Sequence, residues 1–175
     1  MDKNQLAQEI YKVSHLNGEF KLRSGLVSNQ YFDKYLFESN PTLLKEIASQ
    51  LSKLIPEGTE VLAGLEMGGI PIATALSLNT GIPVVFVRKE AKSYGTCKLA
   101  EGTDIQNKNV CIIEDVVTTG GQILLSAEDL KNVGANVKNV LCVIDRNQSG
   151  KENLFEANLQ LHSLLTMEDL LPVTK

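Results

Sequence analysis

The residues best suited to chemistry lie in the segment VCIIEDVVTTGGQI, residues 110–123. An apolar run typical of a buried strand ends there in two adjacent carboxylates, Glu114 and Asp115. Burying a charge is costly unless a partner neutralises it, so we expect both acids at the carboxyl edge of a sheet, facing a ligand. Carboxylates in that position suit sugar hydroxyls or a hydrated Mg²⁺ ion.

The residues that follow, Thr118 to Gly121, are small and carry hydroxyl groups, and they lead into an expected helix. Unpaired N–H groups at a helix N-terminus attract anions, and glycine lets a phosphate approach the main chain. A site for a phosphate next to a site for sugar hydroxyls or a metal ion would suit a ribose 5-phosphate. A simple turn between strand and helix, with Thr118 or Thr119 as N-cap, is the alternative interpretation. Neither a GxxxxGK[ST] loop nor a GxGxxG fingerprint occurs, which disfavours nucleotide hydrolysis and hydride transfer.

A long connection supplies the opposite charge. The 22 residues between Val87 and Val110 show neither strand nor helix periodicity, and loops of that length are usually functional or disordered. Four cations lie near its start: Arg88, Lys89, Lys92 and Lys98. If the loop closes over a site that holds pyrophosphate, they would stabilise charge on that leaving group. A solvated run of charges is the alternative.

Two further stretches follow expected strands. GLEMGGIP (64–71) is a glycine-rich turn suited to a second phosphate, although many such turns are only structural. DRNQSG (145–150) places Arg146 where its guanidinium could form a fork with a substrate carboxylate. A surface ion pair with Asp145 is the alternative.

The surrounding elements predict an α/β fold with a parallel sheet flanked by helices. Apolar spacing predicts a first helix over 5–13, and the segment 19–37 suits two short strands. The pattern then predicts helices over 41–54, 70–78 and 122–133, and strands over 61–65, 82–87, 110–114 and 140–144. We expect residues 1–175 to form a single domain, and ligands of such sheets bind beyond the carboxyl ends of the strands.

Composition narrows the class of protein. The net charge of −4 argues against a nucleic-acid partner. No apolar stretch approaches a membrane span and the N-terminus lacks a signal peptide's apolar segment, so we expect no membrane association and a cytoplasmic location. Three widely spaced cysteines favour free thiols in a reducing compartment, and two isolated histidines indicate no histidine-based metal site.

These motifs resemble those of a known family. VCIIEDVVTTGG is similar to the phosphoribosyl-diphosphate (PRPP) signature of type I phosphoribosyltransferases. FKLRSGLVSNQYFD, GLEMGGIP, FVRKEAKSYGTCKLAEG and VIDRNQSG, in this order, resemble the orotate phosphoribosyltransferase family from about Gly18 to Gly150. The resemblance implies a small N-terminal hood and a long flexible catalytic loop. It also implies the conversion of orotate and PRPP, with Mg²⁺, into orotidine 5′-monophosphate and diphosphate during pyrimidine (UMP) biosynthesis.

The resemblance also implies residue roles. Lys92, Glu114 and Asp115 would be catalytic, the two acids holding the ribose hydroxyls. PRPP would bind to Arg88, Lys89, Lys92, Tyr94, Glu114, Asp115, Val116, Val117, Thr118, Thr119, Gly120, Gly121 and Gln122. Orotate would bind to Arg23, Tyr31, Phe32, Thr118 and Arg146. Magnesium would be held mainly through PRPP and water, and a homodimer would share the loop between subunits.

Three positions depart from the family pattern. Tyr94 stands where many bacterial members have histidine, Arg23 replaces a lysine, and Met67-Gly68 replaces a Tyr-Lys pair. Two other functions stay open at this point. A PRPP-sensing regulator on the same fold would be expected to carry a basic nucleic-acid-binding face, and a transferase for another base would have no use for Arg146.

Overall fold

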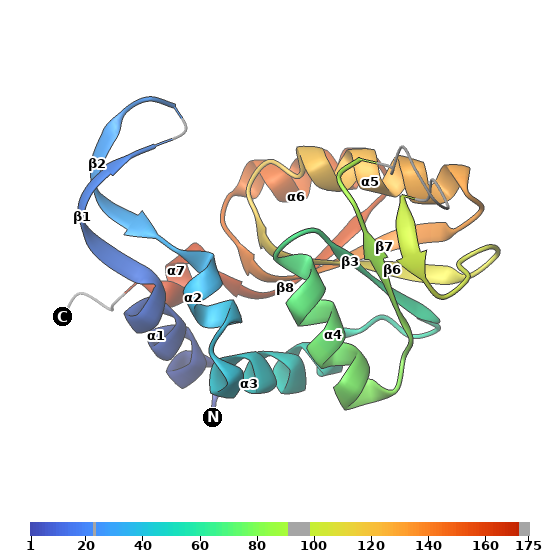
Figure 1. Ribbon diagram of the computed structural model, residues 1–175, viewed down its shortest axis with the longest axis horizontal. Coiled ribbons are helices and arrows are strands. Elements are labelled where there is room, and N and C mark those ends of the chain that lie inside the picture. The colour runs from blue at the N-terminus through green and yellow to red at the C-terminus, as the bar shows by residue number, and fades with distance from the viewer. Residues whose placement is uncertain (23, 91–98, 172–175) are drawn as a thin grey trace.

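A six-stranded sheet covered by helices on both faces forms the centre of the molecule (Figure 1). The computed structural model describes residues 1–22, 24–90 and 99–171. The helices are α1 (Lys3–Ser14), α2 (Lys34–Glu38), α3 (Pro41–Leu51), the 3₁₀ turn η1 (Ser52–Leu54), α4 (Gly69–Thr80), α5 (Gly121–Asn132), α6 (Gln148–Glu156) and α7 (Met167–Leu170). The strands are β1 (His15–Lys21), β2 (Val27–Phe32), β3 (Val61–Leu65), β4 (Val84–Val87), β5 (Ala100–Gly102), β6 (Asn109–Val117), β7 (Asn136–Asp145) and β8 (Gln160–Thr166).

The strand order of the sheet is β5-β4-β3-β6-β7-β8, and β5 is antiparallel to its neighbour while the others are parallel. The chain passes outward from β3 to β4 on one side, and from β6 through β7 to β8 on the other. The direction therefore switches between β3 and β6, which pair along Val61–Val110 to Gly64–Ile113. A crevice at such a switch point, beyond the carboxyl ends of the strands, is where open parallel sheets bind ligands.

Each face of the sheet has its own apolar core. Helices α1, α3 and α4 cover one face through fully buried side chains such as Leu6, Ile47 and Ile72. Helices α5 and α6 cover the other face through Leu130 and Leu154. Because both faces are buried, β3 is apolar throughout and β6 and β7 contain the long apolar runs that the sequence pattern predicted.

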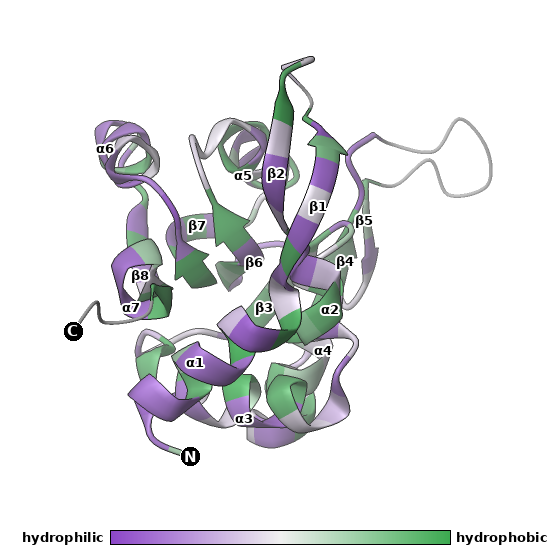
Figure 2. Cartoon of the chain, turned by 90° about the vertical axis from the view of Figure 1, so that its left-hand side faces the viewer, coloured by the Kyte–Doolittle hydropathy of each residue, from purple (hydrophilic) through white to green (hydrophobic). Residues whose placement is uncertain are grey.

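The strands β1 and β2 form a separate antiparallel hairpin. Figure 2 shows this hairpin rising from the layer of α1 and α2, away from α3. Its side chains are mostly exposed, and Leu26 and Val27 are among its exposed apolar residues. The hairpin occupies the place of the small N-terminal hood expected from the sequence.

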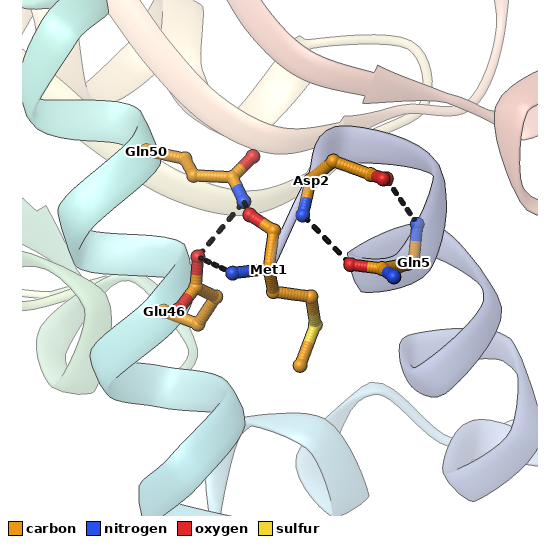
Figure 3. Close-up of polar contacts among 5 residues, drawn as sticks. All are labelled: Met1, Asp2, Gln5, Glu46 and Gln50. Atoms are coloured by element: carbon orange, nitrogen blue, oxygen red, sulfur yellow. Dashed lines mark hydrogen bonds and ion pairs between the residues drawn. The ribbon is translucent and has the colours of Figure 1, made fainter.

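Polar contacts fix the start of α1 against α3 (Figure 3). Asp2 and Gln5 form a capping box, in which the Asp2 carboxylate accepts from the Gln5 N–H at 2.8 Å. The Met1 ammonium lies 3.5 Å from Glu46, and Gln50 donates to the Met1 carbonyl at 3.0 Å. The capping box pairs N–H groups that a helix start otherwise leaves free, and the Met1 contacts tie that start to α3.

The sequence predicted the α/β class and the central elements, but it missed several peripheral ones. Strand β6 continues to Val117, beyond the predicted end at residue 114, so Asp115 lies inside the strand rather than after it. The long connection between Val87 and Val110, for which no strand was predicted, contains the short edge strand β5, and α2, α6, β8 and α7 were not predicted either. These elements are short or contain polar residues, so their periodicity is weak and tertiary pairing decides them. No described helix has the length and apolar character needed to cross a membrane.

Candidate active site

The two adjacent carboxylates differ in their surroundings. Glu114 is half-buried, and its Oε1 accepts a hydrogen bond from the Asp115 N–H at 3.1 Å. Asp115 is 0% exposed, and its Oδ1 accepts from the Val116 N–H at 2.5 Å. The sequence led us to expect both acids at a ligand-facing edge, whereas the structure leaves Glu114 partly accessible and covers Asp115.

Asp115 has a cationic partner from outside the sheet. The Nζ of Lys34, in the first turn of α2, lies 2.5 Å from the Asp115 Oδ2. Although burial alone would raise the pKa of Asp115, contacts with Glu114, Glu38 and Lys34 lower it below its usual value. Burial would likewise lower the pKa of Lys34, but the interaction with Asp115 raises it. Asp115 is therefore held as a carboxylate and Lys34 as an ammonium ion.

The other two carboxyl groups of the cluster behave in the opposite way. Burial, followed by interaction with Asp115, raises the pKa of Glu38 to about 9. The same two causes raise the pKa of Glu114 well above its usual value. Burial and the negative charge of Asp115 therefore both favour the protonated forms of Glu38 and Glu114. A bound cation or an altered contact would change that balance.

The segment after β6 forms a cradle at the start of α5. Thr118 and Thr119 are exposed, and Gly120 adopts φ +75°, a left-handed conformation that favours glycine. Helix α5 begins at Gly121, and Gly121 and Gln122 are also exposed. Exposed hydroxyl groups therefore lie beside the unpaired N–H groups of a helix start, which is an arrangement suited to a phosphate.

Helix α6 supports this cradle from behind. A Cβ atom at Gly150 would overlap the Thr118 carbonyl oxygen, and the Asn153 side chain donates to the Thr119 carbonyl at 2.9 Å. The Arg146 N–H donates to the Val117 carbonyl at 2.9 Å. These contacts bring exposed Arg146 next to the cradle. Thr118 and Arg146, two of the residues expected to contact orotate, therefore lie on neighbouring segments of main chain.

The glycine-rich turn after β3 packs against the same carboxylate. Its Glu66–Met67 peptide bond is cis. A Cβ atom at Gly68 would overlap the Asp115 Oδ2 and lie 3.0 Å from the Glu38 Oε1. A Cβ atom at Gly69 would overlap the Ile113 carbonyl. Side chains at these two positions would push the turn away from β6, so the absence of the lysine expected at position 68 has a steric reason here.

The start of the long connection is tied to this turn. The Lys89 N–H donates to the Glu66 Oε1 at 2.9 Å. The Arg88 Nε lies 3.7 Å from the Glu101 Oε1, so its charge is shared with an acid of β5. The structure thus brings the predicted cations Arg88 and Lys89 to the same end of the sheet as Glu114.

Three predicted site residues, Arg23, Lys92 and Tyr94, lie outside the described residues.

The two aromatic residues predicted to flank the base have different environments. Tyr31 is exposed on the hairpin and stacks on Phe20, with ring centroids 5.4 Å apart. Phe32 is half-buried, packs against the core of the α1, α3 and α4 face, and approaches Phe37 at 6.5 Å. Tyr31 is therefore the more accessible of the two.

Sequence reasoning missed four residues that shape the site: Lys34, Glu38, Gly150 and Asn153. Lys34 and Glu38 come from a five-residue helix far from β6 in the sequence, and no local pattern links them to Asp115. Gly150 lies in the DRNQSG motif, only four residues after Arg146. Its place in that motif was the signal that could have marked it as a site residue.

A large open groove lies elsewhere on the molecule. It measures about 1370 Å³ and is lined by the end of α5, the start of β7, one side of α6 and the start of β8. None of the predicted site residues lines it. Its place at the amino ends of the strands β7 and β8 separates it from the crevice at the switch point.

Comparisons with known proteins agree with this geometry. Residues 37–158 match the family described as "Phosphoribosyl transferase domain". An orotate phosphoribosyltransferase of Nocardioides sp. is 48% identical over 165 residues, covering 94% of this chain and 92% of the relative. The orotate phosphoribosyltransferase of Mycobacterium tuberculosis H37Rv, solved with Fe(III) dicitrate, superimposes with a TM-score of 0.88 at 29% identity, covering 97% of this chain and 99% of that one. A structure of the same protein in complex with PRPP gives 0.83 at 27% identity, with coverage of 97% and 99%.

The fold and the site define a phosphoribosyltransferase of the type I class. Within that class, the chain belongs to the orotate phosphoribosyltransferase family.

Proposed function

We propose that this protein transfers the 5-phosphoribosyl group of PRPP to orotate, giving orotidine 5′-monophosphate and diphosphate in pyrimidine biosynthesis. The observation that carries the proposal is the juxtaposition, at one switch point, of the Thr118–Gly121 cradle, the partly accessible Glu114 and the main chain of Arg146. The complex of a similar protein with PRPP supports the same substrate. In this arrangement the cradle holds the 5-phosphate and the carboxylates face the ribose.

The charges of the site suit the chemistry of the transfer. When the bond between C1 of the ribose and the diphosphate breaks, positive charge develops on the sugar and negative charge on the leaving group. A negatively charged Asp115 near the ring and cations such as Lys89 near the diphosphate stabilise the two ends of that separation. Lys92 is proposed to act on the leaving group. The ring nitrogen of orotate then attacks C1, with its approach fixed by binding.

Arg146 distinguishes orotate from other bases in this proposal. Orotate carries a carboxylate, which an exposed guanidinium can hold with two parallel hydrogen bonds. Arg146 is exposed and its main chain is bonded to Val117, next to Thr118. Tyr31 of the hairpin is proposed to flank the base, together with Phe32 and Arg23.

Magnesium is proposed to bind mainly through PRPP and water. In the described part of the chain, no group of three or more His, Cys, Asp or Glu side chains is arranged to hold a metal ion. Both Asp115 oxygens already have partners, so the partly accessible Glu114 is the group that fits a hydrated ion, whose positive charge would favour the carboxylate form of Glu114. When bound, the ion would neutralise negative charge on the diphosphate.

We further propose a cytoplasmic homodimer in which the long connection of each subunit reaches the active site of the other. The described start of that connection, at Arg88 and Lys89, lies at the switch-point end of the sheet. Sedimentation of the purified protein tests the dimer. Mixing inactive Lys92→Ala with inactive Glu114→Gln subunits should restore part of the activity if the loop is shared, and no restoration would contradict sharing.

The reaction itself is tested by orotate consumption. Purified protein with PRPP, Mg²⁺ and orotate should remove the ultraviolet absorbance of orotate, and chelation by EDTA should stop the loss. Lys92→Ala should lower turnover by about two orders of magnitude or more while PRPP still binds. Consumption of a purine base with orotate left unchanged would overturn the assignment.

A further inference from the structure

Helix α2 connects the hairpin with the acidic cluster. It begins directly after Asp33, whose carboxylate caps it by accepting from the Tyr35 N–H at 3.1 Å, and β2 ends at Phe32. Both Lys34 and Glu38 of this helix interact with Asp115. Tyr31 and Phe32 are assigned to the base, and Asp115 is assigned to the ribose. Lys34 and Glu38, which contact Asp115, therefore follow the base residues closely in the chain.

The Asp115 carboxylate has its orientation fixed on three sides. Its Oδ1 accepts from the Val116 N–H, and its Oδ2 contacts the Lys34 ammonium. The third side is the Gly68 main chain, where no room for a Cβ atom exists. Of these partners, Lys34 is the one that comes from a separate element and carries a charge.

Lys34 is also the more accessible partner of this ion pair. Its side chain is 34% exposed, whereas that of Asp115 is 0% exposed. The ammonium group lies 5.3 Å from the centre of the Tyr35 ring, a cation–π distance that helps to hold its position. The ion pair therefore joins a covered carboxylate to a side chain that solvent can reach.

We propose that Lys34 is a positioning residue for ribose recognition, which holds the Asp115 carboxylate in one orientation against the turn of residues 66–69. The inference rests on the proposed function, in which Asp115 faces the ribose. Without the ammonium group, Asp115 would be a buried charge without a cationic partner and would change its orientation or take up a proton. Lys34 acts through Asp115, not on the substrate.

A second consequence concerns the hairpin. Because Lys34 follows Asp33 directly, a shift of β2 when the base binds would move the Lys34 main chain and with it the partner of Asp115. Base binding and ribose binding are thereby linked through a short covalent connection. If orotate binding moves β2 in this way, removal of the Lys34 charge should reduce the effect of orotate on PRPP affinity.

The test is a double-mutant cycle on PRPP binding, measured by calorimetry with Mg²⁺. Lys34→Met should weaken PRPP binding roughly 10- to 100-fold, the scale expected for a misplaced binding group. Lys34→Arg should recover part of that loss by keeping the charge. In an Asp115→Asn background, Lys34→Met should add less than about twofold, because two residues that act as one unit are not additive.

The matched control is Lys45→Met, the same change at an exposed lysine of α3, which should bind PRPP as the unmodified protein does. Lys34→Gln provides a second variant should the methionine variant fold poorly. Unchanged PRPP binding in a folded Lys34→Met protein would overturn the proposal. A double variant that loses as much PRPP affinity as the product of the Lys34→Met and Asp115→Asn losses would overturn it as well. Failure of the unmodified protein to consume orotate would refute the proposed function alone, since the binding cycle uses PRPP without orotate.

Discussion

Gly150 of α6 lies so close to the main-chain carbonyl of Thr118 that no side chain fits between them. The contact joins a helix that the sequence did not predict to the cradle proposed for the 5-phosphate. Asn153, one turn further along α6, donates to the next carbonyl of the cradle, that of Thr119. The shape of the phosphate cradle thus depends on α6 as well as on its own glycines.

Gly150→Ala should therefore destabilise the protein and weaken PRPP binding. Alanine in a helix normally gains about 1 kcal/mol over glycine, whereas overpacking against a fixed carbonyl costs about 1–3 kcal/mol. We expect a net loss in the free energy of unfolding, measured with urea, and a higher KM for PRPP. Lys151→Ala, at the exposed neighbouring position, is the control and should change neither. A more stable alanine variant with unchanged KM would show that the cradle is independent of α6.

Gly68→Ala should displace the Asp115 carboxylate. The new methyl group would occupy the position of the Asp115 Oδ2 and crowd the Glu38 Oε1. We expect PRPP affinity to fall by roughly tenfold or more, since a small misplacement of a binding group is costly. Calorimetry measures the affinity, and thermal unfolding checks the fold. Met67→Ala, at a 61% exposed neighbour, should leave the unfolding midpoint unchanged.

Glu38 should make the protein less stable as the pH rises. Burial and Asp115 raise the pKa of Glu38 from 4.5 to about 9, so the folded state keeps a proton that the unfolded chain releases. The stabilisation is complete below about pH 4.5 and is lost as the pH rises through about 9. The loss can reach about 1.4 kcal/mol per pH unit.

Comparison with Glu38→Gln isolates this effect, because glutamine stays neutral at every pH. The difference in the free energy of unfolding between the glutamate and glutamine proteins should shift in favour of glutamine between pH 5 and pH 9. Urea titrations at several pH values measure it. Parallel stability curves for the two proteins would show that Glu38 is not held protonated in the folded state.

Arg146→Ala should chiefly affect orotate. Hydrogen bonds to charged groups contribute about 1.5–3 kcal/mol, which corresponds to a roughly 10- to 100-fold higher KM for orotate. The KM for PRPP should change little, because Arg146 contacts the cradle through its main-chain N–H. Arg146→Lys keeps the charge without the fork and should recover part of the loss. Equal losses with an uncharged base would count against a carboxylate fork.

The local signals in the sequence were strong where a motif or a continuous apolar run existed. The run ending in Glu114, the TTGG segment and the GLEMGGIP turn predicted strands, turns and helix starts that the structure contains. The weak signals were those of short elements. Helix α2 has only five residues, and the edge strand β5 has three, so neither is long enough to repeat its period twice.

The sequence by itself determined the α/β class and the order of the central elements and indicated candidate site residues, because each of these signals lies in a contiguous stretch of chain. Tertiary structure decided the state of those residues. It placed Lys34 and Glu38 beside Asp115, leaving Asp115 charged and covered and Glu38 protonated. It also placed Gly150 behind Thr118. Burial and charge pairing depend on distances between elements remote in the chain, and no local pattern of residues specifies those distances.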